Sequence, residues 1–227
     1  MQFSPLGDQA LTITLGNSID EATHRRVRAV VARLDRERPT GLIDLVPAFV
    51  SIAVHYDPAK VGGNSPHESM VATLSALLRD VGDEALPPAR VVEIPVCYGG
   101  DLGPDLGDVA ARHGISEDDV VQIHSDGEYL VYMVGFMPGF AYLGGLSERI
   151  VTPRRSSPRK AVPAGTVGIG GQQTGVYPMI SPGGWNLIGR TPRAIFDIGR
   201  AEPSLLATGD RVRFRPITRD EFNAWRE

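Results

Sequence analysis

Residues 161–190, AVPAGTVGIGGQQTGVYPMISPGGWNLIGR, contain eight glycines and three prolines. No helical period of apolar residues survives in this stretch, and its extended pieces are separated by glycine and proline. Many short strands joined by tight turns are typical of a β-barrel or a β-sandwich. The alternating segment DRVRFRPI (210–217) completes this part, and TRDEFNAWRE (218–227) predicts a final helix opened by Thr218 and Glu221.

Two short helices and a strand are predicted before this stretch. PDLGDVAARHG (104–114) ends in a glycine that is suited to a helix C-terminus. SEDDVVQIHS (116–125) begins with Ser116 and carries Asp119 three residues later, which is the pattern of a capping box. EYLVYMV (128–134) then has strand character.

The first ninety residues have a different, more regular pattern. In chain order they predict a strand over 9–16, a helix that Ser18 and Glu21 would open, strands over 42–46 and 49–56, a helix that begins near Ser65, and a strand over 90–98. This order is that of the split βαβ, or ferredoxin-like, arrangement. The segment VGDEALPPAR (81–90) is the best candidate for a linker, because it has two prolines and little periodicity. We therefore predict an α+β protein, with a ferredoxin-like domain over 1–88 followed by a β-barrel domain over 89–227.

The composition is that of an ordinary globular protein, with 42% hydrophobic and 22% charged residues. A net charge of −4 offers no excess of positive charge to neutralise phosphates, which argues against a nucleic-acid binder. The single cysteine, Cys97, has no partner for an internal disulfide. No run approaches the roughly 18 apolar residues of a membrane span, and no signal-peptide pattern is present. We therefore expect a cytoplasmic protein.

The stretch VGFMPGFAYLGGL (134–146) places three aromatic rings and four glycines on irregular backbone. Loops normally stay polar because their backbone groups need water. Phe136, Phe140 and Tyr142 therefore either fold back over a core or line a cavity that a ligand fills.

The glycine cluster AGTVGIGGQQTG (164–175) matches neither common nucleotide motif. It lacks the Lys-Ser or Lys-Thr of a P-loop, and no helix follows it that could hold a pyrophosphate. Two interpretations stay open: the glycines are strand ends and bulges of a barrel, or the bare backbone at 168–171 lets a ligand approach closely.

The segment RIVTPRRSSPRK (149–160) carries five cations and no acid. Such a run is either a solvated face or a binding site for an anion. Two prolines stiffen it, and the planar fork of an arginine can form two parallel hydrogen bonds with a carboxylate or phosphate. Arg154 and Arg159 are the candidates for that role.

The five histidines show no metal-ligand spacing, so we predict no metal site. His124 is expected at the end of a helix, just before the strand that leads into the aromatic stretch. A capping role and a catalytic role are both open for it. Ser181 has no neighbouring base in the sequence, so no local signature of nucleophilic catalysis is present.

The segment QTGVYPMISPGGWNLIGRTP (173–192) carries hydrogen-bonding groups and aromatic rings at close spacing. Strand alternation would direct about half of them to one side. Such a set is typical of a small-molecule cleft and also of the rim of a protein interface. The residues are Gln173, Thr174, Tyr177, Ser181, Trp185 and Asn186.

Three segments, IPVCYGGDLGPDLGDVAARHGIS (94–116), HSDGEYLVYMVGFMPGFAYLGGL (124–146) and the tract from TPRRSSPRK to GRTP (152–192), together resemble the KipI/PxpB family. This family is also called allophanate hydrolase subunit 1, or the carboxyltransferase-domain C/D family. Its specific motifs are GFxPGFAYL and SPGGW, and the resemblance covers nearly all of 90–193. It implies a small α/β N-terminal domain followed by a cyclophilin-like β-barrel.

The resemblance also implies a function. One branch takes part in the ATP-dependent opening of 5-oxoproline to glutamate, together with a KipA/PxpC-type subunit (allophanate hydrolase subunit 2) and a PxpA/LamB-type hydrolase subunit. ATP, with Mg²⁺, is then expected at the level of the complex, and no tightly bound cofactor is expected. Two alternatives are a KipI-type inhibitor of a sensor histidine kinase, and a carboxyltransferase half of the allophanate hydrolase or urea carboxylase type.

The matching positions supply candidate site residues. His124 and Arg154 are the catalytic candidates, with Arg154 directed at an anionic group of the substrate. Candidate substrate-binding residues are Phe136, Pro138, Phe140, Tyr142, Arg159, Gly170, Gln173, Thr174, Tyr177, Ser181 and Trp185. This assignment predicts that segments 134–146 and 154–185 converge around a single hollow.

Overall fold

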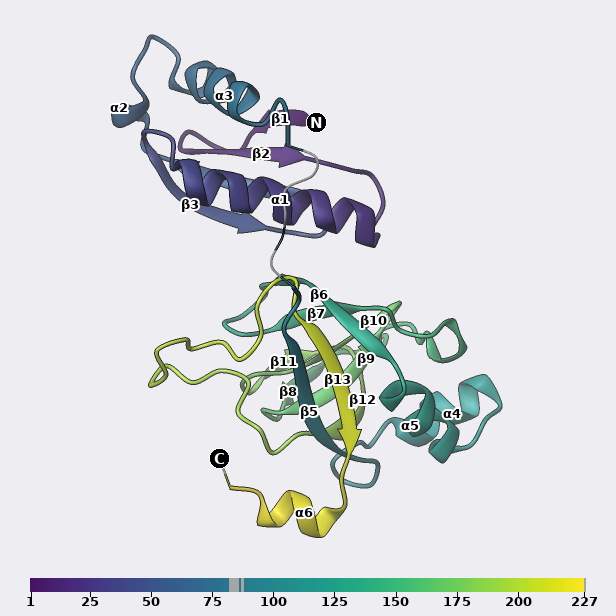
Figure 1. Ribbon diagram of the computed structural model, residues 1–227. Helices are drawn as coiled ribbons and strands as arrows, with labels where there is room; N and C mark the ends of the chain where they lie inside the picture. The colour runs from purple at the N-terminus through teal and green to yellow at the C-terminus, as the bar shows by residue number, and fades with distance from the viewer. Residues whose placement is uncertain (82–85, 87, 227) are drawn as a thin grey trace. The chain divides into compact units, whose positions relative to one another are not determined.

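The computed structural model describes residues 1–81, 86 and 88–226 of the chain. It divides into two compact units, Met1–Pro88 and Ala89–Glu227 (Figure 1). Part of the predicted linker, residues 82–85 and 87, lies outside the described residues. Among the helices that the structure describes, none has the length and apolar character of a membrane span.

The first unit is a four-stranded antiparallel sheet with the strand order β1-β2-β4-β3. Its elements are β1 (Gln2–Pro5), β2 (Ala10–Thr14), α1 (Glu21–Glu37), β3 (Leu42–Pro47), β4 (Ser51–Tyr56), α2 (Pro58–Val61) and α3 (Pro66–Leu77). In register, Leu11 lies beside Val54 and Ile13 beside Ile52, so these four side chains share one face of the sheet. Residues of α1 and α3 pack with them into one core, which is therefore on the helix-covered face.

Local sequence explains where these helices begin. Ser65 accepts a hydrogen bond from the backbone N–H of Glu68 at the start of α3, as the sequence predicts. The prediction for α1 is displaced by two residues. Asp20 is its N-cap in place of Ser18, and the Asp20 carboxylate accepts from the Thr23 N–H at 2.7 Å.

The ferredoxin-like arrangement is not confirmed for the first unit. The predicted last strand of that pattern, now β5 (Val91–Tyr98), pairs with β12 and β13 in the second unit. The edge of the sheet next to β2 is occupied by β1, which the sequence pattern did not predict as a strand. Hydrophobic periodicity indicates that a segment forms an apolar strand, but it does not specify which strand lies beside it. The neighbours of β5 are barrel strands.

The second unit contains a closed seven-stranded β-barrel with the order β10-β7-β6-β13-β5-β12-β9. Strands β5 and β13 run parallel and the other neighbours are antiparallel. The remaining elements are α4 (Leu106–His113), α5 (Glu117–Ser125), β6 (Glu128–Val134), β7 (Ala141–Gly144), the 3₁₀ helix η1 (Glu148–Ile150), β8 (Arg159–Val162), β9 (Thr166–Gly170), β10 (Gln173–Val176), β11 (Ser181–Gly183), β12 (Asn186–Arg190), β13 (Arg211–Pro216) and α6 (Arg219–Ala224). The predicted barrel is therefore present.

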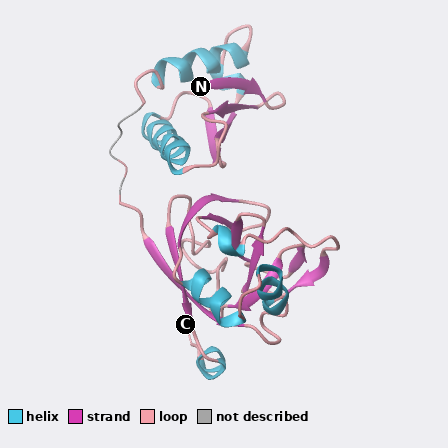
Figure 2. Cartoon of the chain, turned by 90° about the vertical axis from the view of Figure 1, so that its right-hand side faces the viewer, coloured by secondary structure: helices cyan, strands magenta, loops and turns pink. Residues whose placement is uncertain are grey.

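Inward-facing aliphatic residues of the barrel strands form one buried core, which includes Ile94, Val131 and Ile169. Strands β8 and β11 pair separately as a two-stranded sheet. Figure 2 shows long loops between the strands of this unit. The barrel thus supplies a rigid scaffold, and the polar and aromatic residues of interest lie mostly on the loops that it holds in place.

Candidate functional site

Four aromatic side chains of the second unit surround Phe140, the residue that follows the β6–β7 turn. The Phe140 ring centroid lies 4.9 Å from that of Tyr142, 5.3 Å from that of Tyr177 and 5.5 Å from that of Trp185, all at steep angles. Such edge-to-face contacts are the favoured geometry of aromatic pairs. Phe136 completes the group, with its ring centroid 5.6 Å from that of Phe140.

The glycines near these rings make room for them. A Cβ atom on Gly170 would lie 2.4 Å from Nε1 of Trp185, and one on Gly183 would lie 2.5 Å from the Tyr177 hydroxyl. Gly170 is buried and packs against the indole ring, and it does not line the cleft described below, so its predicted role in substrate binding stays a prediction. The co-occurrence of glycine and aromatic residues in this sequence follows from this packing.

The aromatic group forms the wall of a cleft with a volume of about 330 Å³. Its residues come from three segments: the β6–β7 turn, the loop before β8, and the chain from Tyr177 to Trp185. The lining residues are Phe136, Phe140, Tyr142, Arg154, Arg155, Pro158, Tyr177, Pro182, Gly183, Gly184 and Trp185. The prediction that segments 134–146 and 154–185 converge around one hollow is thus confirmed, and we call this hollow the aromatic cleft.

Arg154 is the exposed cation of the aromatic cleft. Its guanidinium carbon lies 5.9 Å from the centroid of the Trp185 ring, within the range of a cation–π contact. No carboxylate of the described residues forms an ion pair with it. Burial raises the pKa of Tyr177, and the charge of Arg154 opposes that rise. An anion entering the cleft would therefore meet an unneutralised guanidinium beside the rings.

Arg159 and Arg155 are held by a carboxylate that the sequence did not single out. Arg159 donates from both terminal nitrogens to Asp105, at 2.9 and 2.7 Å, and Arg155 donates to it at 3.0 Å. The backbone N–H of Leu187 also donates to Asp105 at 2.7 Å. Asp105 occupies the N-cap position of α4, but its side chain makes no capping hydrogen bond. Arg159 does not line the aromatic cleft and is ion-paired with Asp105, so its predicted role in substrate binding stays a prediction that this geometry does not favour.

His124 lies inside the barrel, fully buried, and does not line the aromatic cleft. Its Nδ1 is 2.8 Å from the Tyr98 hydroxyl and its Nε2 is 2.9 Å from the hydroxyl of Thr174. Thr174 donates its own proton to the Gly168 carbonyl, so Nε2 carries the hydrogen and Nδ1 accepts from Tyr98. Burial lowers the pKa of His124 to about 3. These contacts favour a neutral structural imidazole over the predicted catalytic one.

The other predicted site residues are distributed around the cleft rather than in it. Thr174 is buried as the partner of His124, and the Ser181 hydroxyl bonds to the Pro182 carbonyl. Gln173 starts β10 opposite Gly170, and Pro138 is exposed in the β6–β7 turn. None of these four lines the aromatic cleft. The alternation of side chains along a strand could not predict that Tyr177 and Trp185 line the cleft and these four do not, because strand β10 ends before Tyr177.

Phe136 differs from the other rings because it is 65% exposed. Its backbone has a φ of 71°, in the left-handed region that non-glycine residues seldom adopt. The Gly135 N–H donates to the Phe140 carbonyl at 3.0 Å, which closes the turn around it. A strained aromatic residue held at the rim of a cleft is a common feature of ligand-binding and partner-binding sites.

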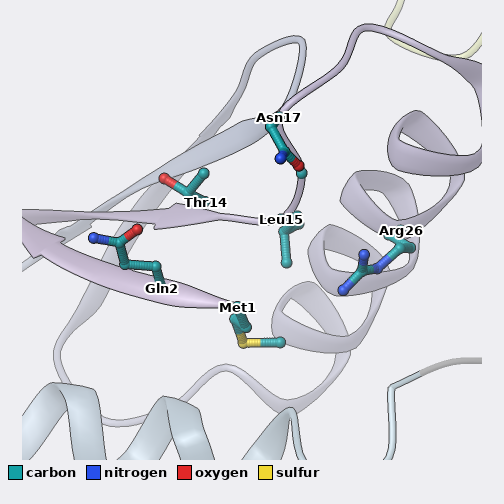
Figure 3. Close-up of a pocket in the computed structure, with 7 residues that line it drawn as sticks. Met1, Gln2, Thr14, Leu15, Asn17 and Arg26 are labelled. Atoms are coloured by element: carbon teal, nitrogen blue, oxygen red, sulfur yellow. The ribbon is translucent and has the colours of Figure 1, made fainter.

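A larger cavity, of about 500 Å³, lies in the first unit. Figure 3 shows Gln2 and Thr14 on its strands and Arg26 on α1. Arg26 is the one charged side chain among its lining residues, which include no carboxylate, histidine or cysteine. Within residues 1–81, 86 and 88–226 no cluster of three or more metal-ligating side chains is present. The aromatic cleft is therefore the stronger candidate for chemistry.

Comparison with known proteins agrees with this assignment of the fold and the motifs. The family model described as carboxyltransferase domain, subdomain C and D, matches residues 1–206. The chain is 45% identical to the B-type subunit of 5-oxoprolinase from Bacillus subtilis (strain 168), over 100% of this chain and 97% of that protein. It is 43% identical to the B-type subunit of 5-oxoprolinase from Escherichia coli O157:H7, over 93% of this chain and 94% of that protein. The crystal structure of TTHA0988 matches with a TM-score of 0.80 and 39% identity, over 92% of this chain and 40% of that one. This chain thus spans about two fifths of TTHA0988.

Proposed function

Because the chain belongs to the carboxyltransferase domain, subdomain C and D, family, we propose that it is the B-type subunit of an ATP-dependent 5-oxoprolinase whose substrate binds in the aromatic cleft. The observation that carries the proposal is the 45% identity with the B-type 5-oxoprolinase subunit of Bacillus subtilis, which extends over nearly the full length of both chains. The enzyme would be a hydrolase that works as a complex in the cytoplasm.

The chemistry of the aromatic cleft suits this substrate. 5-Oxoproline is a small flat lactam that carries one carboxylate. Arg154 would pair with the carboxylate, because it is exposed and has no acidic partner among the described residues. The faces of the lactam ring would lie against Tyr142 and Trp185. A hollow of about 330 Å³ is at the lower end of the usual size of a small-molecule site.

In the proposed reaction, the lactam oxygen takes the γ-phosphoryl group of ATP and ADP leaves. Water then adds to the activated carbon, and the C–N bond breaks as the ring nitrogen takes up a proton, which leaves an acyl phosphate. A second water hydrolyses this acyl phosphate and gives glutamate and inorganic phosphate. Negative charge develops on oxygen in these steps, so fixed cations and N–H donors would stabilise the transition states. Arg154 and Arg155 line the cleft and could supply part of that charge. ATP with Mg²⁺ would be bound at the level of the complex.

A partner subunit is part of the proposal. The relatives are named as subunits, and TTHA0988 contains further polypeptide beyond the 40% that this chain matches. We propose that a KipA/PxpC-type subunit supplies the corresponding part here, and that a PxpA/LamB-type subunit completes the hydrolase. The exposed ring of Phe136, at the rim of the cleft, would contact the partner.

The test is reconstitution. The chain is co-purified with both proposed partner subunits, and ATP hydrolysis is measured with and without 5-oxoproline. We expect 5-oxoproline-dependent hydrolysis, and Arg154→Gln should raise the KM for 5-oxoproline by about tenfold or more, the cost of losing a charge-assisted hydrogen bond. Arg213→Gln, which removes an exposed cation that bonds Glu128, is the matched control and should leave the KM unchanged. An intact complex without 5-oxoproline-dependent turnover would reject the proposal.

A second candidate function is inhibition of a sensor histidine kinase, and the exposure of Phe136 is the observation that favours it. Here Phe136 would be an interface anchor and no reaction would occur. Two results together would support this alternative. The chain would bind a sensor histidine kinase, with binding lost in Phe136→Ala, and it would have no effect on 5-oxoproline turnover. The carboxyltransferase-half alternative has the family description in its favour and would need a carboxylated carrier as substrate.

A further inference from the structure

The second unit has another cavity, of about 430 Å³, that shares no lining residue with the aromatic cleft. The loop before β9, the end of β12 with the turn after it, and helix α6 surround this cavity. We call it the basic pocket, because its charged lining residues are Arg190 and Arg193.

Both guanidinium groups of the basic pocket are only partly satisfied. Arg190 donates from Nε to the Ala164 carbonyl at 2.7 Å, and Arg193 donates from Nη1 to the Glu93 carbonyl at 2.8 Å. Each bond uses one of the five N–H groups that an arginine can donate. Within the described part of the chain, neither arginine forms an ion pair.

Asp101 and Glu93, two carboxylates that interact with the arginines of the basic pocket or share a residue with their contacts, are paired with other arginines. Asp101, whose pKa is lowered mainly by its hydrogen bond with Arg219, forms an ion pair with that arginine. The Glu93 carboxylate accepts from Arg215 at 2.8 Å. The charge of Arg190 also acts on Asp101 through space, but neither arginine of the pocket forms a direct ion pair with these carboxylates.

The pocket also has apolar walls and a fixed edge. Ile195 is 1% exposed, and Phe222 of α6 is half-buried against Leu102 and Ile217. Gly165 has a φ of 79°, and the Thr191 N–H donates to its carbonyl at 2.9 Å. A Cβ on Gly165 would lie 2.4 Å from the Thr191 carbonyl oxygen, so the backbone here approaches as closely as glycine permits.

We propose that the basic pocket binds a phosphate-bearing small molecule, of which nucleotides are the class to test. A phosphate dianion would lie between Arg190 and Arg193, whose free Nη groups match its charge and its several acceptor oxygens. The apolar part of the ligand would lie against Phe222 and Ile195. A single carboxylate would neutralise only half of the charge. The argument for this pocket does not use the aromatic cleft, whose own cation is Arg154, so binding here is tested separately from 5-oxoproline turnover.

Binding is measured by isothermal titration calorimetry on the full chain, with ATP, inorganic phosphate, 5-oxoproline and glutamate as separate ligands. We expect ATP and phosphate to bind, and to bind more weakly as salt is added. Arg193→Gln should weaken ATP binding by about tenfold or more. Arg190→Lys keeps the charge but loses the planar fork, and should weaken it less.

Arg213→Gln is the control, because it removes an exposed cation that lines neither the basic pocket nor the aromatic cleft. It should bind ATP like the parent chain. Two-dimensional amide spectra establish that each variant is folded. The proposal is overturned if neither phosphate ligand binds at millimolar concentration, if Arg193→Gln binds ATP as the parent does, if Arg213→Gln weakens ATP binding equally, or if only the carboxylates bind.

Discussion

The Asp105 carboxylate accepts hydrogen bonds from both terminal nitrogens of Arg159, at 2.9 and 2.7 Å. These bonds join two segments that are 54 residues apart. Arg155 and the Leu187 N–H bind the same carboxylate. Within the arginine run of 149–160, Arg155 and Arg159 are therefore ion-paired with the residue that precedes α4, whereas Arg154 has no acidic partner among the described residues. Arg154 and Arg155 both line the cleft, so this buried acid leaves Arg154 as the cleft's unneutralised cation.

Asp105→Asn should lower the free energy of unfolding by about 3 kcal/mol, because it leaves two partly buried guanidinium groups without their counter-ion. Chemical denaturation followed by near-UV circular dichroism of the barrel measures this. Asp101→Asn is the control, since it breaks a pair whose carboxylate is 75% exposed, and it should leave the free energy of unfolding close to that of the parent. Equal effects of the two substitutions would contradict the structural role of Asp105.

Gly170→Ala should displace the Trp185 ring, because the added Cβ would lie 2.4 Å from its Nε1. Overpacking of this kind costs about 1–3 kcal/mol, and the tryptophan fluorescence should change with it. Gly184→Ala adds the same atom where the nearest neighbour is at 3.6 Å, so its stability should stay near that of the parent. A Gly170→Ala variant with parental stability and fluorescence would show that the indole is not held as described.

The free energy of unfolding should fall as the pH is lowered from about 6.5 towards about 3. Burial lowers the pKa of His124 to about 3 in the folded chain, whereas an unfolded histidine titrates near 6.5. Between these values the unfolded chain binds one more proton, so stability rises with pH by up to about 1.4 kcal/mol per unit and this part is complete above 6.5.

The pH effect is isolated with His124→Gln, which should lack this component of the slope even if its overall stability is lower. In the parent chain, the imidazole carbon-bound protons of His124 should show no titration by NMR between pH 7 and 4.5. A titration centred near 6.5 would contradict the buried neutral imidazole and would reopen the predicted catalytic role.

Truncation of Phe136 should affect partner binding, whereas truncation of Phe140 should affect stability. Phe136→Ala removes a ring that is 65% exposed, so stability should change by about 0.5 kcal/mol or less while co-purification with a partner weakens. Phe140→Ala removes a ring that is 2% exposed and should cost about 3–5 kcal/mol. Thermal unfolding and pull-down assays measure both. If Phe136→Ala retained full partner binding and full activity, this ring would have no role in assembly or in the cleft.

Much of the fold could be predicted because its signals are local. The capping boxes at Ser116 and Thr218 are both present at the predicted helix starts. The glycine-rich pattern of 161–190 predicted a β-barrel or a β-sandwich, and the resemblance to the family implied the barrel that is present. The last strand of the expected ferredoxin-like pattern was assigned wrongly, because the residues of β5 carry an apolar period that does not specify β12 and β13 as partners.

The candidate site was predictable only as a set of residue types. The spacing of rings and glycines identified Phe140, Tyr177 and Trp185, and the cleft contains all three. The same reasoning placed His124, Thr174 and Arg159 among the site residues. It could not foresee that the first two bond each other inside the barrel, or that Asp105 binds the third. Those partners are at least 50 residues away in the chain.

By itself, then, the amino-acid sequence determined the barrel, the helix starts and the membership of the family, since these depend on short-range patterns and on motifs that the residues spell out directly. Only the tertiary structure decided that Arg154 has no acidic partner in the cleft and that His124 is buried. It also decided that Gly170 and Gly183 leave room for aromatic rings. The physical reason is that burial and ion pairing depend on contacts between distant segments, and the same side chain is a ligand-binding group in water and a structural one beside a buried partner.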